Sequence, residues 1–331
     1  DCPSTSYYYL RMREAMMRLY LALYLMILLN LGGLVPAHAQ EPSESGLLET
    51  TDEMLQTAAR LRGLEPKGPI QRGVKDKAEI SRYLNEHVQA EYPQGEIEKE
   101  GKILRKLGLI PETMDYRAFV IRLLTEQVGG YYDPDKKTFY IASWLSSEEQ
   151  KPFMIHELTH ALQDQHFDLA KILKEDRSGK NDDRVLAHQA VMEGDGMAVM
   201  LQYFLEPAQR HFSQLPDLSS IMRAQMLSMQ MQFPVFKEAP PYLRETLLFP
   251  YGYGASFLQY AWRKNPSWQA VNTLYSDLPV STEQIMHPEK YFGERDLPKP
   301  VHAEDIAARI GPGWKVAGRN VLGEFTLGLF M

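Results

Sequence analysis

The chain has 331 residues, of which 44 % are hydrophobic and 24 % are charged, with a formal net charge of −7 at pH 7. These proportions are ordinary for a globular protein, and the length allows one large domain or two small ones. The acidic balance gives no basis for a nucleic-acid partner, and the single cysteine, Cys2, excludes a disulfide framework and a cysteine-based metal site.

The N-terminal region has the pattern of a targeting segment. Three arginines precede an apolar run over residues 19–35, and residues 37–39 have the A-x-A form of a cleavage site before Gln40. We therefore predict a signal peptide over residues 1–39 and an exported protein, periplasmic or extracellular. An uncleaved membrane anchor is the alternative, because the run approaches the length of a membrane span. Met12, Met16 and Met17 are candidate natural starts, in which case about the first eleven residues are not native.

Two regions follow before the motif-bearing part of the chain. Residues 40–75 are rich in Glu, Pro, Gly and Ser, a composition that predicts a flexible linker. Residues 76–127 contain three helix-like stretches, at 77–92, 95–109 and 115–127, and are predicted to be a helical N-terminal region. Such a region would either cover the domain that follows or act as a pro-region.

A β-hairpin is predicted next. Residues 128–133 and 138–143 are rich in strand-forming residues, and Asp-Pro-Asp-Lys-Lys at 133–137 is a turn sequence. A strand at the rim of a cleft could pair with an extended peptide by strand addition. The alternative is an ordinary sheet edge.

Residues 156–160 read His-Glu-Leu-Thr-His in an apolar, helix-patterned segment. His156 and His160 are four residues apart, so on a helix they lie one turn apart on the same face, where both can bind one Zn²⁺. Glu157 can reach a water on that metal and act as its general base. This is the H-E-x-x-H pattern of zinc hydrolases.

A catalytic zinc needs a third protein ligand, for which two residues compete. His166 lies ten residues after His156, where metzincin-type peptidases carry their third histidine. Those enzymes turn the chain with a glycine at the position of Gln163, and on a continuing helix His166 would point about 240° away from His160. Glu193 lies in a mostly apolar helix predicted over 184–205, where an acid needs a partner or a metal. The pattern favours Glu193.

The glycines that follow Glu193, Gly194 and Gly196, weaken a helix but would let another backbone or the metal helix approach closely. A ligating histidine usually donates its other N–H to a carboxylate or a carbonyl. Asp164, one turn beyond His160, and Asp195 are the candidates for orienting an imidazole. The alternative for both is a solvated helix acid.

Amide hydrolysis also needs a donor for the developing oxyanion. The candidates are His287, before Pro288 in a turn-like stretch, and Tyr251 and Tyr253, before a helix-like stretch at 255–263. Residues 206–220 and 233–250 are predicted to be loops. His287 is the first choice, because a loop histidine before proline has no evident core role. Packing is the alternative for each tyrosine.

Four segments together resemble a known family. Tyr131–Pro134, His156–Leu169, Glu193–Asp195 and Ser281–Tyr291 are similar to motifs of the gluzincin metallopeptidases, the broad group that includes thermolysin, and more closely to the peptidase-MA-like proteins of bacteria. The resemblance covers about residues 115–325. It implies a zinc-dependent, protease-like fold whose substrates are mostly undefined.

The chain also departs from this group. Thermolysin-like enzymes carry an aspartate four residues after the ligand glutamate, where this chain has Met197, with Asp195 as a substitute. The G-x-M-E-N strand of the large aminopeptidases is absent, which argues against that specificity.

We therefore predict an α+β protein. Residues 128–331 would form a mostly helical zincin-like catalytic domain with a small mixed sheet beside the metal helix, and an apolar run at the end favours a chain that continues further. The predicted function is a secreted zinc metallopeptidase that acts on a peptide or protein substrate. The alternatives are a non-catalytic envelope binding or scaffolding protein and a zinc amidase of non-protein amides. Glu157 favours an enzyme, because a structural zinc does not need it.

Overall fold

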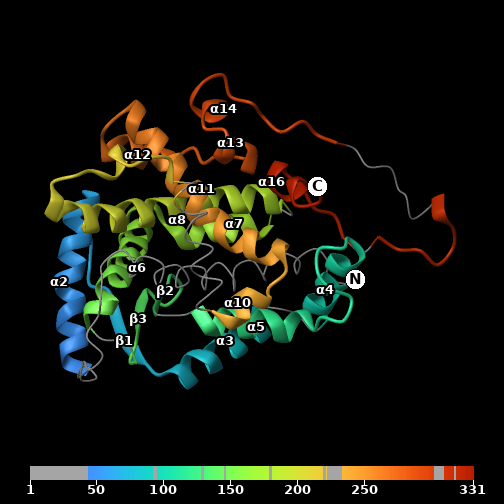
Figure 1. Cartoon of the computed structure of the whole chain (residues 1–331), viewed down its shortest axis with the longest axis horizontal. Coiled ribbons are helices and arrows are strands. Elements are labelled where there is room, and N and C mark those ends of the chain that lie inside the picture. Colours follow the sequence, from blue (N-terminus) through green and yellow to red (C-terminus); the bar gives the residue numbers. More distant parts are fainter. Residues whose placement is uncertain are drawn as a thin grey trace.

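The computed structural model describes residues 44–91, 95–127, 130–144, 147–178, 181–218, 221, 233–301, 309–316 and 318–331. Within them the protein is mostly helical with a small mixed three-stranded sheet, which confirms the predicted α+β class (Figure 1). The predicted signal segment, residues 1–39, lies outside the described residues.

The elements, in chain order, are α2 (Glu44–Arg62), β1 (Gln71–Lys75), α3 (Lys77–Glu91), α4 (Glu96–Lys106), α5 (Tyr116–Gln127), β2 (Gly130–Asp133), β3 (Thr138–Ala142), α6 (Ser147–Phe167), α7 (Leu169–Ser178), α8 (Asp182–Leu205), the 3₁₀ turns η3 (Glu206–Ala208) and η4 (Phe212–Gln214), α10 (Pro234–Glu238), α11 (Pro241–Lys264), α12 (Trp268–Leu274), α13 (Thr282–Met286), α14 (Glu289–Phe292) and α16 (Glu324–Gly328). Their buried apolar side chains form one continuous cluster that reaches from Leu47 to Phe325.

The sheet has the strand order β1-β3-β2, with β2 antiparallel and β1 parallel to β3. The predicted hairpin is confirmed, and its turn follows from local chemistry. Asp133 accepts hydrogen bonds from the backbone N–H groups of Asp135 and Lys136, at 3.1 Å each, and Lys137 adopts a left-handed φ of 51°. A short aspartate side chain that bonds its own turn favours this reversal.

Three long helices form the centre of the molecule. Helices α8 and α11 run side by side, and α6 packs between α8, α2 and strand β2 (Figure 1). Helix α8 begins at an N-cap, because the side chain of Asn181 accepts the N–H of Arg184 at 3.0 Å, and acids at 182 and 183 oppose the positive end of the helix. The helix predicted over 184–205 is thereby confirmed.

The prediction of a linker over residues 40–75 is wrong for its described part. Helix α2 occupies residues 44–62 and β1 residues 71–75, and α2 packs along α6. Leu47, Met54, Ala58 and Leu61 are buried at helical spacing. Polar residues at 41–46 and 63–69 dominated the composition and hid this apolar stripe.

The loop predicted over 233–250 is also wrong. Helix α10 begins at Pro234, and α11 already begins at Pro241 and runs through Pro250 to Lys264. Proline at the first position of a helix loses no hydrogen bond, so Pro234 and Pro241 start helices instead of breaking them, whereas Pro250 lies inside α11.

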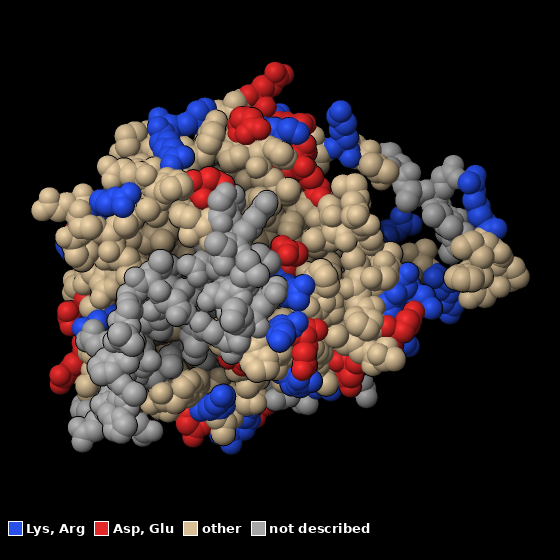
Figure 2. Space-filling model, viewed as in Figure 1, with Lys and Arg blue, Asp and Glu red and all other residues tan. Residues whose placement is uncertain are grey.

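Acidic and basic residues are interspersed over the face shown in Figure 2, and basic residues gather beside the extended C-terminal segment. In the part of the chain that the structure describes, no helix combines the length and the apolar character needed to cross a membrane.

Candidate metal centre

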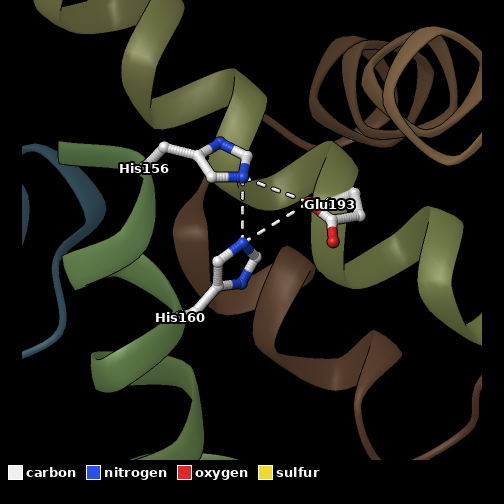
Figure 3. A group of neighbouring side chains, drawn as sticks. All are labelled: His156, His160 and Glu193. Carbon is white, nitrogen blue, oxygen red and sulfur yellow. Dashed lines mark hydrogen bonds and ion pairs between the residues drawn. The ribbon is translucent and has the colours of Figure 1, made fainter. Parts of the chain in front are cut away.

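Helix α6 carries both histidines of the motif, and α8 brings Glu193 to them (Figure 3). Nε2 of His156 and Nε2 of His160 lie 3.0 Å apart, and Oε2 of Glu193 lies 3.1 Å from the former and 3.4 Å from the latter. All three side chains are buried. Ligand atoms held tetrahedrally at about 2.0–2.1 Å from an ion are about 3.3 Å apart, so this group could hold one metal ion.

The charge states of these side chains also fit a metal site. Burial lowers the pKa of His156, although its hydrogen bond with Glu193 opposes this. Burial by itself would raise the pKa of Glu193, but the two histidines hold that pKa below its ordinary value. A neutral imidazole and a carboxylate are the forms that bind metal ions.

Glycines allow the helices to meet at this point. A Cβ atom added at Gly196 would lie 2.8 Å from Cε1 of His156, and one at Gly194 would lie 2.3 Å from the carbonyl carbon of Gly254 on α11. A Cβ atom at Gly254 would lie 2.0 Å from the carbonyl oxygen of Ala190. The predicted use of the glycines beside the ligand carboxylate, to admit a neighbouring backbone and the metal helix, is confirmed.

Gln163 orients the second histidine, a role that was not predicted from the sequence. Its Oε1 lies 2.8 Å from Nδ1 of His160, and its Nε2 donates to the carbonyl oxygen of Met192 at 3.1 Å. With an amide oxygen as acceptor, Nδ1 carries the hydrogen and Nε2 keeps its lone pair for a metal. Because Met192 precedes Glu193, Gln163 also joins the two helices that supply the ligands. The available signal was an amide side chain one turn after a histidine on the same helix.

Glu157 lies beside the metal-binding group but outside it. It is buried, and its Oε2 accepts the backbone N–H of Tyr132 on β2 at 3.0 Å. Burial raises the pKa of Glu157 well above its ordinary value, the charge of Glu193 adds to this, and the hydrogen bond from Tyr132 opposes it. A carboxyl group with a raised pKa is suited to proton transfer near neutral pH.

The contact with Tyr132 also corrects the prediction of a substrate-binding strand edge. In the sheet, β2 is an edge strand, but α6 packs against it and all four of its residues are buried. The outward N–H of Tyr132 is already bonded to Glu157. This edge therefore is not free to pair with an extended peptide.

Asp164 does not orient a ligand histidine. Its Oδ2 accepts the hydroxyl of Tyr132 at 2.8 Å and Nζ of Lys137 at 2.5 Å. The prediction placed Asp164 on the correct side of α6, one turn beyond His160. However, the hairpin lies against that side, and its residues Tyr132 and Lys137 bond the carboxylate of Asp164. The imidazole of His160 is bonded by Gln163 instead.

Asp195 also has partners other than a histidine. Its carboxylate accepts Nε of Arg62 at 2.6 Å and the hydroxyl of Tyr275 at 2.8 Å. Two residues along a helix correspond to about 200° of rotation, so Asp195 faces away from the side on which Glu193 lies. The prediction that Asp195 fills the role of the aspartate of thermolysin-like enzymes, and orients a histidine, is therefore wrong.

His166 does not join the metal-binding group. His166 lies at the end of α6, and its Nε2 is 2.7 Å from the carbonyl oxygen of Glu65. Helix α6 continues through residue 163 to Phe167, so the rotation that argued against His166 applies. The alternative with His166 as third ligand is wrong. Among the described His, Cys, Asp and Glu side chains, the group that could hold a metal ion consists of His156, His160 and Glu193.

Of the two tyrosine candidates for the oxyanion donor, Tyr251 is brought to the group. Its ring centroid lies 6.1 Å from that of His156, and the side chain is fully buried. Tyr253 stacks on Phe249 at 4.9 Å and is partly exposed. Both lie within α11 and not before it.

His287, the first choice as donor, is placed elsewhere. It ends α13, is partly exposed, and lies 2.9 Å from Glu324. Its segment is attached to the start of α8, because Thr282 donates its backbone N–H to Asp183 at 3.1 Å. Asp183 lies ten residues before Glu193, which is about 15 Å along the helix. Of the three candidates, Tyr251 therefore lies near the group, and the preference for His287 is wrong on placement.

No protein-family model, curated protein or solved structure matches this chain. Of the four segments behind the resemblance, Tyr131–Pro134, His156–Leu169 and Glu193–Asp195 adjoin one another at the metal-binding group. The fourth, Ser281–Tyr291, packs at the start of α8.

Proposed function

We propose that this chain is an exported zinc-dependent peptidase with a zincin-like catalytic domain. One observation carries the proposal: a buried His156–His160–Glu193 group lies beside a second buried acid, Glu157, that is not part of it. A purely structural zinc site has four protein ligands and needs no such acid. Three ligands with a neighbouring base are typical of a catalytic site.

The chemistry follows from the positions of the side chains. A zinc ion in the group would polarise the scissile carbonyl and make water more acidic. Glu157 takes the proton from the attacking water and delivers it to the leaving amine. The hydrogen bond from Tyr132 holds the carboxylate of Glu157 at a fixed place during both steps. Tyr251 is the candidate donor to the developing negative charge.

The test compares the wild-type protein with Glu157→Gln, by metal analysis and by digestion of a broad peptide library. We expect both proteins to retain one zinc, and the variant to lose at least about 10²–10⁴-fold in rate, the usual contribution of a general base. Glu126→Gln is a matched control, because Glu126 also accepts backbone N–H bonds, from Val235 and Phe236 at 2.9 Å each.

The same experiment separates the alternatives. Zinc without cleavage of any peptide, in both proteins, would support a non-catalytic binding or scaffolding protein. Cleavage of small non-protein amides but no peptide, lost in Glu157→Gln, would support the amidase. Equal cleavage by wild type and Glu157→Gln would refute the role of Glu157.

A further inference from the structure

Tyr132 contacts the metal helix at two points. Its backbone N–H donates to Oε2 of Glu157 at 3.0 Å, and its hydroxyl donates to Oδ2 of Asp164 at 2.8 Å. The two acids are seven residues apart, which is two turns, so they lie on the same side of α6 and about 10 Å apart along its axis. One residue of β2 therefore lies along two turns of the helix.

The second contact is reinforced from the hairpin turn. Nζ of Lys137 lies 2.5 Å from the same oxygen of Asp164, and Lys137 holds the left-handed position at the end of the turn. Asp164 is buried, whereas Lys137 is half exposed. Hydrogen bonds to a charged partner are stronger than neutral ones, so Asp164 holds the hairpin firmly on both sides of its turn.

We propose that Tyr132 is a positioning residue for the reaction, whose hydroxyl fixes β2 on α6 so that its backbone N–H aims the carboxylate of Glu157. This inference rests on the proposed function, because it concerns how the general base is held. A carboxylate on a helix can rotate about its side-chain bonds. The direction of a backbone N–H is fixed by its strand. The N–H of Tyr132 can therefore hold the carboxylate of Glu157 in one orientation only if β2 is fixed in position on α6.

Tyr131 provides a matched control on the same strand. Side chains alternate along a strand, so Tyr131 faces the opposite side of the sheet from Tyr132. Its ring centroid lies 4.9 Å from those of Tyr83 and Tyr140, and it is as deeply buried as Tyr132. Replacing either tyrosine by phenylalanine removes one buried hydroxyl from β2, but only one of the two hydroxyls bonds to α6.

The kinetic test uses the full-length protein. Tyr132→Phe should lower kcat about 10- to 100-fold with KM and zinc content unchanged, since loss of an outer hydrogen-bond partner has effects of this size. Tyr131→Phe should leave kcat unchanged. Asp164→Ala should reproduce the loss, and Asp164→Asn, whose amide oxygen still accepts the hydroxyl, should restore most of the rate. Equal losses in Tyr131→Phe and Tyr132→Phe, or a loss that follows zinc content, would overturn the proposal.

A second measurement does not depend on activity. Hydrogen exchange of the amide at position 132 should be faster in Tyr132→Phe and in Glu157→Ala than in the wild type, and unchanged in Tyr131→Phe. Unchanged exchange in Tyr132→Phe would overturn the inference even if the protein is a peptidase. Faster exchange in a protein that hydrolyses nothing would leave the contact established and refute the proposed function instead.

Discussion

Gln163 is the side chain whose removal best separates metal binding from folding. It bonds Nδ1 of His160 and the carbonyl oxygen of Met192, and it has no exposed surface. Gln163→Leu keeps the approximate size of the side chain but removes both hydrogen bonds. We expect the imidazole to lose its fixed orientation, while α6 and α8 stay packed.

The magnitude follows from these contacts. Each buried polar group that loses its partner costs about 1–3 kcal/mol, and the N–H of His160 is such a group. Losing the partner of a ligating histidine usually weakens metal binding 10- to 100-fold, which corresponds to about 1.4–2.7 kcal/mol. The first cost falls on the stability of the fold, with or without metal, and the second falls on metal binding, so Gln163→Leu should raise the Kd for zinc by 10- to 100-fold.

The assay is a competition titration of the metal-free protein with a chelating dye. Gln165→Leu is the control, because Gln165 lies on the same helix and bonds backbone groups through both ends, at 2.7 Å to the N–H of Lys67 and at 3.0 Å to the carbonyl of Gly68. It touches no ligand, so its variant should keep the wild-type Kd. An unchanged Kd in Gln163→Leu, or equal weakening in both variants, would refute the reasoning.

Three further results are expected. Glu193→Ala should reduce zinc retention by dialysed protein to a small fraction, whereas His166→Ala should retain zinc as wild type does; the reverse order would restore the metzincin-like arrangement. Gly196→Ala should raise the zinc Kd about tenfold in the dye titration, because its Cβ would lie 2.8 Å from the ring of His156, which must tilt. The raised pKa of Glu157 means that its carboxyl group stabilises the fold fully only below its ordinary pKa of 4.5, and that this stability is lost as the pH rises. Metal-free Glu157→Gln should therefore be more stable than wild type to urea at pH 7, with a difference that shrinks towards pH 4, and a difference independent of pH would contradict this.

The ligand group could be predicted because its determinants are local. Two histidines at i and i+4 face one direction on any helix, and Glu193 is anomalous within an apolar helical run. The hairpin was predictable for the same reason, since Asp133 and the residues after it form their own turn. Such features need no knowledge of how the elements pack.

The partners of these residues depend on packing, and there the predictions failed. Asp164 was predicted to orient His160 because it lies one turn away on the same helix. In the structure the β2–β3 hairpin packs against α6, and its residues Tyr132 and Lys137 bond the carboxylate of Asp164. Gln163 was considered only as the residue in place of the turn glycine of metzincin-type peptidases, and its bond to His160 was not predicted. The assignment of His287 required knowing where its segment returns, and periodicity carries no information about that.

The buried pair of Arg62 and Asp195 sets a limit on trimming of the chain. Nε of Arg62 lies 2.6 Å from the carboxylate, neither side chain has exposed surface, and Arg62 also stacks over Trp268 at 4.6 Å. Removing residues up to the hairpin would leave Asp195 buried without its cation, two residues from Glu193, at a cost of about 3–5 kcal/mol. Helix α2 is thus part of the smallest unit that can support the candidate metal centre. N-terminal proteolysis that spares this site has to end before Arg62.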